Sequence, residues 1–301
     1  AELIREKCGQ PQAQVHMMTG GTSANVIALA AFLRPYEAAI CAPTGHIHVH
    51  ETGALEATGH KILTCEAKEG KVIPQGVAEV CARHTDEHMV FPRLLYISQP
   101  TEIGTVYSLS ELKALRQVCD ENGLLLFVDG ARLGSALTSA ECDMTLRDLA
   151  ALADCFYIGG TKNGLLFGEA MVIVNPALQT NFRYMIKHNG GMMAKGRLCG
   201  VMFLAAMEKD DYFAWARHAN AMADIVRTGM EKGGVPLYQR TTTNQIFAVL
   251  TQEQNETLEK DFSYEIWEKL EGGKVAVRFV TSWATSEEDA HKLADALEAF
   301  A

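Results

Sequence analysis

Short apolar runs alternate with segments of helical periodicity through the first two thirds of the chain. The apolar runs predict strands that begin near residues 15, 38, 94, 124, 155 and 168. Between them, the pattern predicts helices at 22–33, 108–123 and 145–153. Strands that alternate with helices of this length are typical of a mainly parallel sheet covered by helices on both faces. The sequence therefore predicts an α/β fold.

The pattern changes after a long helical stretch from about residue 197 to 233. Strand-like runs at 244–250, 264–270 and 275–283 then follow one another with one short helix between them, before a terminal helix at 286–300. Such an order predicts a separate, smaller α+β domain. We expect a large domain over residues 1–205 and a small domain over 206–301. The first residues already have a helical pattern, so we also expect that an N-terminal segment is missing.

Charge and cysteine content narrow the function classes. Acidic residues outnumber basic ones by 37 to 27, and the net charge is −10. This balance disfavours nucleic acid and anionic membranes as partners. The eight cysteines are widely spaced without a C-x-x-C pair, which argues against a zinc ribbon or a disulfide framework. No apolar run approaches the roughly 20 residues that span a bilayer. We therefore expect a cytoplasmic protein.

Three histidines alternate with other residues in "TGHIHVHETGA", residues 44–54. If this segment is a strand, His46, His48 and His50 share one face at intervals of about 7 Å and can chelate a divalent ion. A metal-dependent hydrolase is then one candidate function. In the alternative, one imidazole has another role, and the other two lie at a helix start or on the surface.

The segment "TGGTSAN", residues 19–25, places glycines and hydroxyls immediately before a helix. Free backbone N–H groups and the helix dipole favour an anion, most often phosphate, at such a position. A plain helix cap by Thr22 or Ser23 explains the same residues equally well.

An aspartate ends the apolar strand in "FVDGARLG". Open α/β sheets bind ligands at the carboxyl ends of their strands, so Asp129 is a candidate site residue. Alternatively, Asp129 satisfies loop amides or forms a structural ion pair with Arg132.

Lys162 follows two glycines and a threonine in "FYIGGTKNG", on a turn that leaves a strand. Most lysines are solvated surface residues. A lysine among apolar and glycine residues can instead lose part of its hydration, which lowers its pKa and lets it attack a carbonyl.

Together, these segments supply an anion site, an acid at a strand end and a lysine on the next strand. Pyridoxal 5'-phosphate (PLP) needs these parts for its phosphate, its pyridine nitrogen and its aldehyde. A histidine from residues 44–54 can stack on the flat ring. The motif order then resembles the threonine aldolase family, also called the β-eliminating lyase family, of fold type I PLP enzymes in the aspartate aminotransferase superfamily. The matching stretches are "GGTSAN", "HIHVHETGALEATGHK", "FVDGARLG", "YIGGTKNG" with "FGEA", and "VRFVTSW".

The resemblance implies a role for each matching residue. Lys162 binds the cofactor aldehyde, and Asp129 holds the pyridine nitrogen. Arg132 lies beside the ring, and His46 stacks on it. The remaining roles are the phosphate contacts of Gly21 and Thr22 and the substrate carboxylate clamp of Arg278. Under this interpretation His48 and His50 have no metal role. For Arg278, the alternative is an outward ion pair on a small-domain strand.

The chain departs from the family pattern in one loop. Some relatives carry a second histidine there that contacts the substrate β-hydroxyl, whereas this chain has Thr101 and Glu102. We expect Glu102 to replace it in part.

The family implies retro-aldol cleavage of L-threonine or L-allo-threonine to glycine and acetaldehyde. His46, or a water molecule that it holds, is our candidate for the base. The alternatives are PLP-dependent β-elimination on serine- or cysteine-type substrates, or a catalytically inactive protein of this fold. The family further implies a homodimer or homotetramer. In such an oligomer, Lys187 and Lys195 are candidates to reach the cofactor phosphate of a neighbouring subunit.

Overall fold

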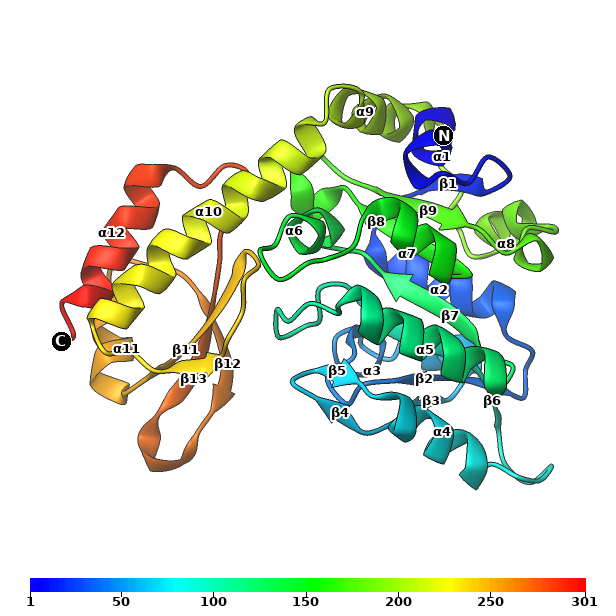
Figure 1. Ribbon diagram of the computed structural model, residues 1–301, viewed down its shortest axis with the longest axis horizontal. Helices are drawn as coiled ribbons and strands as arrows, with labels where there is room; N and C mark the ends of the chain where they lie inside the picture. Colours follow the sequence, from blue (N-terminus) through cyan, green and yellow to red (C-terminus); the bar gives the residue numbers. More distant parts are fainter.

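A seven-stranded sheet organises the larger part of the computed structural model, which describes residues 1–301 (Figure 1). Its four central pairings, among β3, β2, β6, β7 and β8, are parallel, whereas β9 pairs antiparallel with both β8 and β1. The predicted mainly parallel sheet is therefore confirmed. In spatial order the strands are β1 (Gln14–Met18), β9 (Glu169–Ile173), β8 (Cys155–Gly159), β7 (Leu125–Asp129), β6 (Phe91–Ser98), β2 (Glu37–Cys41) and β3 (Ile62–Thr64).

Both faces of this sheet are buried, as predicted. Successive residues of a strand point to opposite faces, so Leu126 and Val128 of β7 join one hydrophobic cluster while Leu125 and Phe127 join another. The first cluster includes α1 (Glu2–Cys8), α4 (Pro74–Arg83), α5 (Leu109–Glu121) and α7 (Leu146–Leu152). The second includes α2 (Gly21–Phe32) and α8 (Phe182–His188). By the same alternation, Asp129 belongs to the face that α2 covers.

The connecting segments contain shorter elements. The predicted long helical stretch is two helices, α9 (Arg197–Glu208) and α10 (Asp211–Lys232), separated at Asp210, which has a φ of 59°. The further elements are α3 (His46–Val49), η1 (Glu56–Thr58), β4 (Ala67–Lys68), β5 (Lys71–Val72), α6 (Leu133–Leu137), η2 (Thr161–Asn163) and η3 (Pro176–Leu178).

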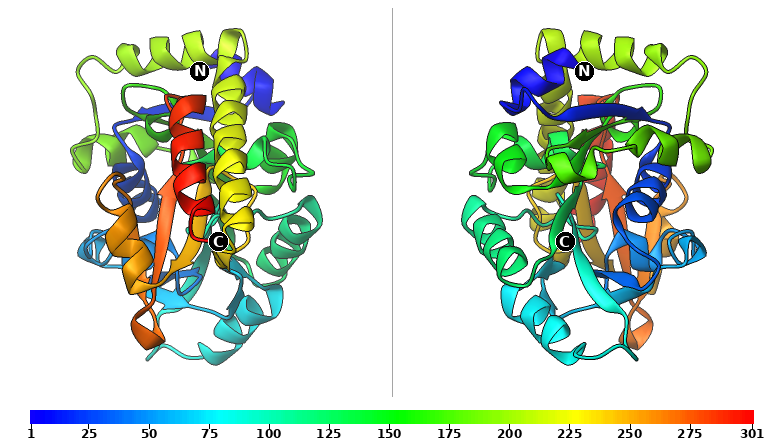
Figure 2. Two further views of the ribbon diagram at one scale, coloured as in Figure 1. Left: turned by 90° about the vertical axis from the view of Figure 1, so that its left-hand side faces the viewer. Right: turned by 90° about the vertical axis from the view of Figure 1, so that its right-hand side faces the viewer.

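A second sheet occupies the C-terminal part of the chain. It is antiparallel, with strands in the order β10 (Leu237–Gln239), β11 (Gln245–Leu250), β13 (Val275–Val280) and β12 (Glu265–Lys269). Figure 2 shows α12 (Glu287–Glu298) alongside α10, and both helices pack on this sheet through a common hydrophobic cluster. The elements α11 (Gln252–Leu258) and η4 (Glu271–Gly273) complete it.

Two general expectations can be compared with this structure. All eight cysteines are free, and six of them are buried. No helix combines the length and apolar character that are needed to cross a membrane.

Candidate active site

The carboxyl ends of β7 and β8 approach each other closely because Gly130 follows β7 and Gly159 is the last residue of β8. A Cβ atom on Gly130 would lie 1.9 Å from the carbonyl oxygen of Tyr157, and one on Gly159 would lie 2.3 Å from that of Ala131. Any side chain at either position would force the two loops apart. The loop that carries Arg132 and the turn that carries Lys162 are thereby held together at one edge of the sheet.

Asp129 is a buried carboxylate with three donors. Its Oδ2 atom accepts hydrogen bonds from the Tyr96 hydroxyl at 2.5 Å and from Asn25 Nδ2 at 3.2 Å, and its Oδ1 atom accepts one from the Ala131 N–H at 2.9 Å. The last bond shows that Asp129 does satisfy a loop amide. The predicted alternative of an ion pair with Arg132 is wrong, because no such pair forms within the chain.

The histidine segment is a short helix, so the strand geometry considered for a metal site is wrong. His46 is half-buried at the start of α3, whereas His48 and His50 are exposed. A helical turn sends alternate side chains in different directions. No three His, Cys, Asp or Glu side chains come together as a metal-binding group in the chain. The segment therefore matches the alternative, in which a single imidazole faces the site.

Glu51 fixes the orientation of the His46 ring. The Glu51 Oε1 atom lies 2.8 Å from His46 Nδ1 and also accepts a hydrogen bond from Asn25 Nδ2 at 3.1 Å. Burial lowers the pKa of His46, but the hydrogen bond to Glu51 and the negative charge of Asp129 outweigh it, and the net pKa is raised. Because Nδ1 is bonded to Glu51, the Nε2 atom of His46 is left to exchange a proton with another group.

The N-terminus of α2 carries no side-chain cap. Its cap position is Gly20, and Thr22 and Ser23 lie inside the helix, so the predicted alternative of a plain cap by either residue is wrong. The Ser23 hydroxyl donates to the Gly20 carbonyl oxygen instead. Thr22 is exposed, and Gly21 lies close to the Tyr157 hydroxyl. Uncapped N–H groups at such an end favour an anion.

Lys162 lies in the η2 turn, immediately beyond β8. It remains accessible to solvent, yet partial loss of hydration and the positive charge of Arg132 lower its pKa. Burial and the charge of Arg278 lower the pKa of Arg132 to about 10. The charges of Arg132 and Arg278 thus both act on the pKa of Lys162, although Arg278 comes from the second sheet. Glu169, which is buried, accepts the Gly160 N–H at 2.7 Å and so secures the start of the turn.

Arg278 faces this site from β13 and makes several contacts. Its Nη1 atom donates to Gln245 Oε1 at 3.2 Å, its Nη2 atom forms an ion pair with Glu265, and its guanidinium carbon lies 5.1 Å from the ring centre of Trp267. The ion pair expected in the alternative interpretation of Arg278 is therefore present, and its partner is Glu265 on β12. That contact does not exclude a site role, because the buried Nε atom has no hydrogen-bond partner.

Thr101 and Glu102, which stand where some relatives have a second histidine, are both buried. The Thr101 hydroxyl bonds with that of Thr105 at 2.7 Å. Glu102 Oε1 accepts hydrogen bonds from the His46 N–H at 2.8 Å and from the Ser98 hydroxyl at 2.6 Å. Glu102 therefore anchors the backbone that carries His46.

These residues fit the parts that PLP requires. The uncapped helix end suits a phosphate, the buried Asp129 carboxylate suits a protonated ring nitrogen, and Lys162 supplies an amine of lowered pKa. In addition, Glu51 Oε2 and Asn25 Oδ1 are buried without hydrogen-bond partners beside Asp129 and His46. Polar atoms left in this state mark a place where a ligand or water completes the bonding.

Sequence reasoning missed Asn25, Glu51 and Glu265. Asn25 is a fully buried polar residue on an otherwise apolar helix face, and that break in the pattern was the available signal. Glu51 is the only carboxylate in residues 44–54, so it was the available partner for a histidine there. For Glu265 no local signal existed, because only strand pairing brings it to Arg278.

Comparisons with known proteins agree with this fold. The fold and the site define a member of the fold type I class of PLP-dependent enzymes. An aspartate aminotransferase from Thermus thermophilus, solved with maleate, shares the fold at 15% identity with a TM-score of 0.71, covering 100% of this chain and 80% of that one. The family model for beta-eliminating lyases matches residues 1–253. The chain belongs to this family, and the resemblance seen in the sequence is confirmed.

Two relatives are more similar. A low specificity L-threonine aldolase from Pseudomonas aeruginosa is 32% identical over 284 residues, which cover 93% of this chain and 81% of the relative. A solved structure of a Leishmania major threonine aldolase is 44% identical and has a TM-score of 0.97. It covers 99% of this chain and 87% of that one.

Proposed function

We propose that this chain is a PLP-dependent lyase that cleaves the Cα–Cβ bond of L-threonine or L-allo-threonine to give glycine and acetaldehyde. One observation carries the proposal: the Glu51-oriented His46 lies at the same sheet edge as Asp129 and Lys162. Cleavage of a β-hydroxy amino acid needs a base for the hydroxyl proton in addition to the groups that hold PLP. The threonine aldolase names of the two relatives support it.

The residues that would hold PLP follow from their positions. Lys162 would bind its aldehyde, Asp129 its ring nitrogen, and the N-terminus of α2 at Gly21 and Thr22 its phosphate. His46 would stack on the ring, with Arg132 beside it. When bound, PLP supplies an electron-withdrawing ring that stabilises negative charge on the substrate Cα.

The protein groups would each perform one task in cleavage. Arg278 binds the substrate α-carboxylate and thereby selects which Cα bond is oriented to break. His46 accepts the β-hydroxyl proton, while Glu51 retains its bond to Nδ1. As the C–O double bond of acetaldehyde forms, the Cα–Cβ electron pair remains on Cα. Asp129 would hold the ring nitrogen of bound PLP in its protonated form, and the proton that His46 took from the hydroxyl would return to Cα, directly or by exchange with water, to yield glycine.

The second candidate is β-elimination, which the lowered pKa of Lys162 favours. A lysine that is more readily neutral at a given pH can remove the Cα proton, after which a leaving group departs from Cβ. In that case Lys162 handles the decisive proton, and His46 has only a stacking role.

The products distinguish the two reactions. The holoenzyme is incubated with both threonine diastereomers, with serine and with a cysteine conjugate, and glycine, acetaldehyde and pyruvate are quantified. We expect glycine and acetaldehyde from threonine in equal amounts, with loose discrimination at Cβ. Pyruvate from serine or the conjugate, without glycine from threonine, would establish elimination instead.

We further propose that the chain forms a homodimer or homotetramer. Three large apolar side chains are exposed on α9, namely Leu198, Val201 and Leu204, and Tyr184 is exposed on α8. Large apolar side chains grouped on a surface favour association.

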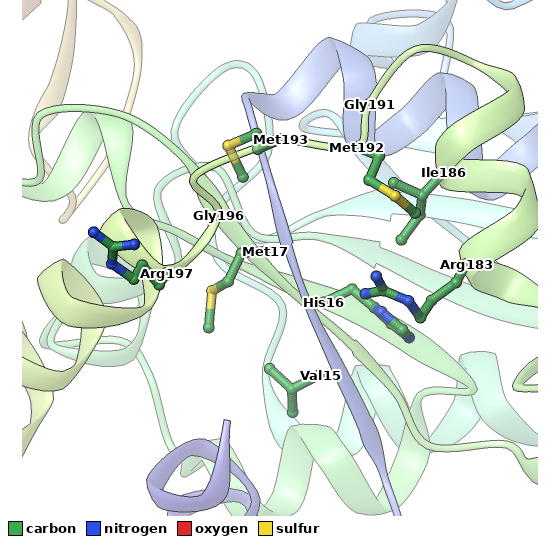
Figure 3. Close-up of a pocket in the computed structure, with 10 residues that line it drawn as sticks. All are labelled: Val15, His16, Met17, Arg183, Ile186, Gly191, Met192, Met193, Gly196 and Arg197. Atoms are coloured by element: carbon green, nitrogen blue, oxygen red, sulfur yellow. The ribbon is translucent and has the colours of Figure 1, made fainter.

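A basic pocket beside these helices supports the same proposal. It has a volume of about 310 Å³ and lies between β1, α8 and the start of α9. Figure 3 shows Arg183 next to His16 in it. Burial and Arg183 lower the pKa of His16 to about 4. Neither Arg183 nor Arg197 forms an ion pair within the chain. Arg183 and Arg197, together with Lys187 and Lys195, could therefore bind an anionic group of another subunit.

Light scattering of the holoenzyme tests the oligomer. We expect a mass of two or four chains at concentrations where the enzyme is active. A monomer with full activity would contradict the proposal.

The proposed location is the cytoplasm, because eight unpaired thiols suit a reducing compartment. Subcellular fractionation checks it, and recovery in an oxidising compartment would contradict it. No nucleic-acid or membrane partner is part of the proposal.

A further inference from the structure

Glu265 and Arg278 are paired directly across the two neighbouring strands β12 and β13. The Arg278 Nη2 atom and the Glu265 carboxylate form an ion pair. The two side chains differ in exposure: 19% of the Arg278 side chain is accessible, against 49% for Glu265. The arginine is therefore the fixed partner, and the carboxylate is the one that can turn into solvent.

The position of Arg278 does not depend on Glu265 alone. Gln245 accepts a hydrogen bond from its Nη1 atom, and Trp267 lies against the guanidinium group. The register of β12 is irregular between Ile266 and Glu268, at Trp267. Such irregularities redirect a side chain, and the Trp267 ring also contacts Phe247 and His50. Arg278 would remain in place if Glu265 moved away.

Glu265 is a negative charge among positive groups of the site. Its charge acts on Arg132 and on His50, which also experience the opposing charge of Arg278. The Arg278 Nε atom is buried and has no hydrogen-bond partner. The Nε and Nη2 atoms form the edge of a guanidinium group that binds a carboxylate through two parallel hydrogen bonds. Glu265 occupies only one half of this edge.

We propose that Glu265 is a resident counterion of Arg278, which the α-carboxylate of the amino-acid substrate displaces from Nη2. This inference rests on the proposed function, since it takes Arg278 as the group that binds the substrate carboxylate. The two carboxylates are chemically alike and compete for the same N–H group. Glu265 thereby sets how tightly amino acids bind, although it does not contact the reacting atoms.

The test compares Glu265→Gln with the matched control Glu268→Gln in the holoenzyme. Glu268 lies on the same strand but bonds with the Tyr238 hydroxyl. A half-exposed ion pair contributes little, so removal of the competing charge should lower the KM for L-threonine by roughly 2- to 5-fold at unchanged kcat. Calorimetric titration with glycine should give a dissociation constant lowered by the same factor. The control should match the wild type in both measurements.

An unchanged or raised KM in Glu265→Gln would overturn the proposal, and a raised value would mean that Glu265 positions Arg278. Glu265→Ala provides a second variant, which should lower the KM in the same direction, and thermal melting verifies that each variant folds. Failure of the proposed function is a separate result: the wild-type holoenzyme would then not cleave threonine, whatever the KM effect of Glu265.

Discussion

Substitution of Lys162 by alanine is expected to abolish threonine cleavage, with a loss in kcat/KM of at least roughly 10³-fold. The side chain is the only lysine amine at the carboxyl ends of β7 and β8, and its lowered pKa makes it a better nucleophile. Because the side chain is exposed, its removal should leave the melting temperature nearly unchanged. We also expect the variant to lose bound cofactor. Steady-state kinetics measure the loss of activity, and the visible absorbance of the purified variant measures the loss of cofactor.

The attachment point can be tested on the wild type. Borohydride reduction followed by peptide mapping should locate the pyridoxyl group on Lys162. A pyridoxyl group on Lys187 or Lys195 would refute the assignment.

Replacement of Asp129 by asparagine should lower kcat by roughly 10²- to 10³-fold while the protein stays folded. Asparagine has a single oxygen, which in the place of Oδ2 still accepts the bonds from Tyr96 and Asn25, whereas its NH2 group in the place of Oδ1 cannot accept the Ala131 N–H. Besides that one bond, the substitution removes the negative charge that would stabilise a protonated ring nitrogen. The measurement is kcat for L-threonine, together with the melting temperature.

Asp154→Asn is the matched control for this variant. Asp154 is a structural carboxylate that pairs with Arg116 at 2.8 Å and accepts the Leu126 N–H at 2.7 Å. Its substitution should lower the melting temperature and leave kcat nearly unchanged. If Asp129→Asn keeps wild-type kcat, Asp129 has no electrostatic role in the reaction.

The sequence predicts the central strands because both faces of the sheet are buried. Continuous apolar runs such as 124–128 are long enough for a strand that is buried on both faces and too short for a buried helix. The direction of β9 is not encoded in its own residues, since its apolar pattern is equally compatible with parallel pairing. The strand geometry considered for the histidine segment is wrong for another reason. The alternation in "HIHVH" is typical of a strand, but the segment is a single helical turn, from which Ile47 packs into the core.

Residues of the site were predictable where a strand end places them. Asp129 ends one apolar strand and Lys162 lies three residues beyond the end of the next, and parallel strands end at one edge of the sheet. Glu51 and Asn25 were not predicted, since their contacts join a loop to a helix 26 positions away in the chain. The Glu265–Arg278 pair depends on strand register, which a sequence determines only through the packing of the whole sheet.

The amide nitrogen of Asn25 donates to both Glu51 and Asp129. Glu51 holds His46, and the charge of Asp129 acts on the same ring. A side chain replaced at one end of this chain of groups therefore changes the hydrogen bonding at the other. A protein engineer who alters His46 to change stereochemical preference also disturbs the bonding of Asp129, the group proposed to hold the ring nitrogen of PLP.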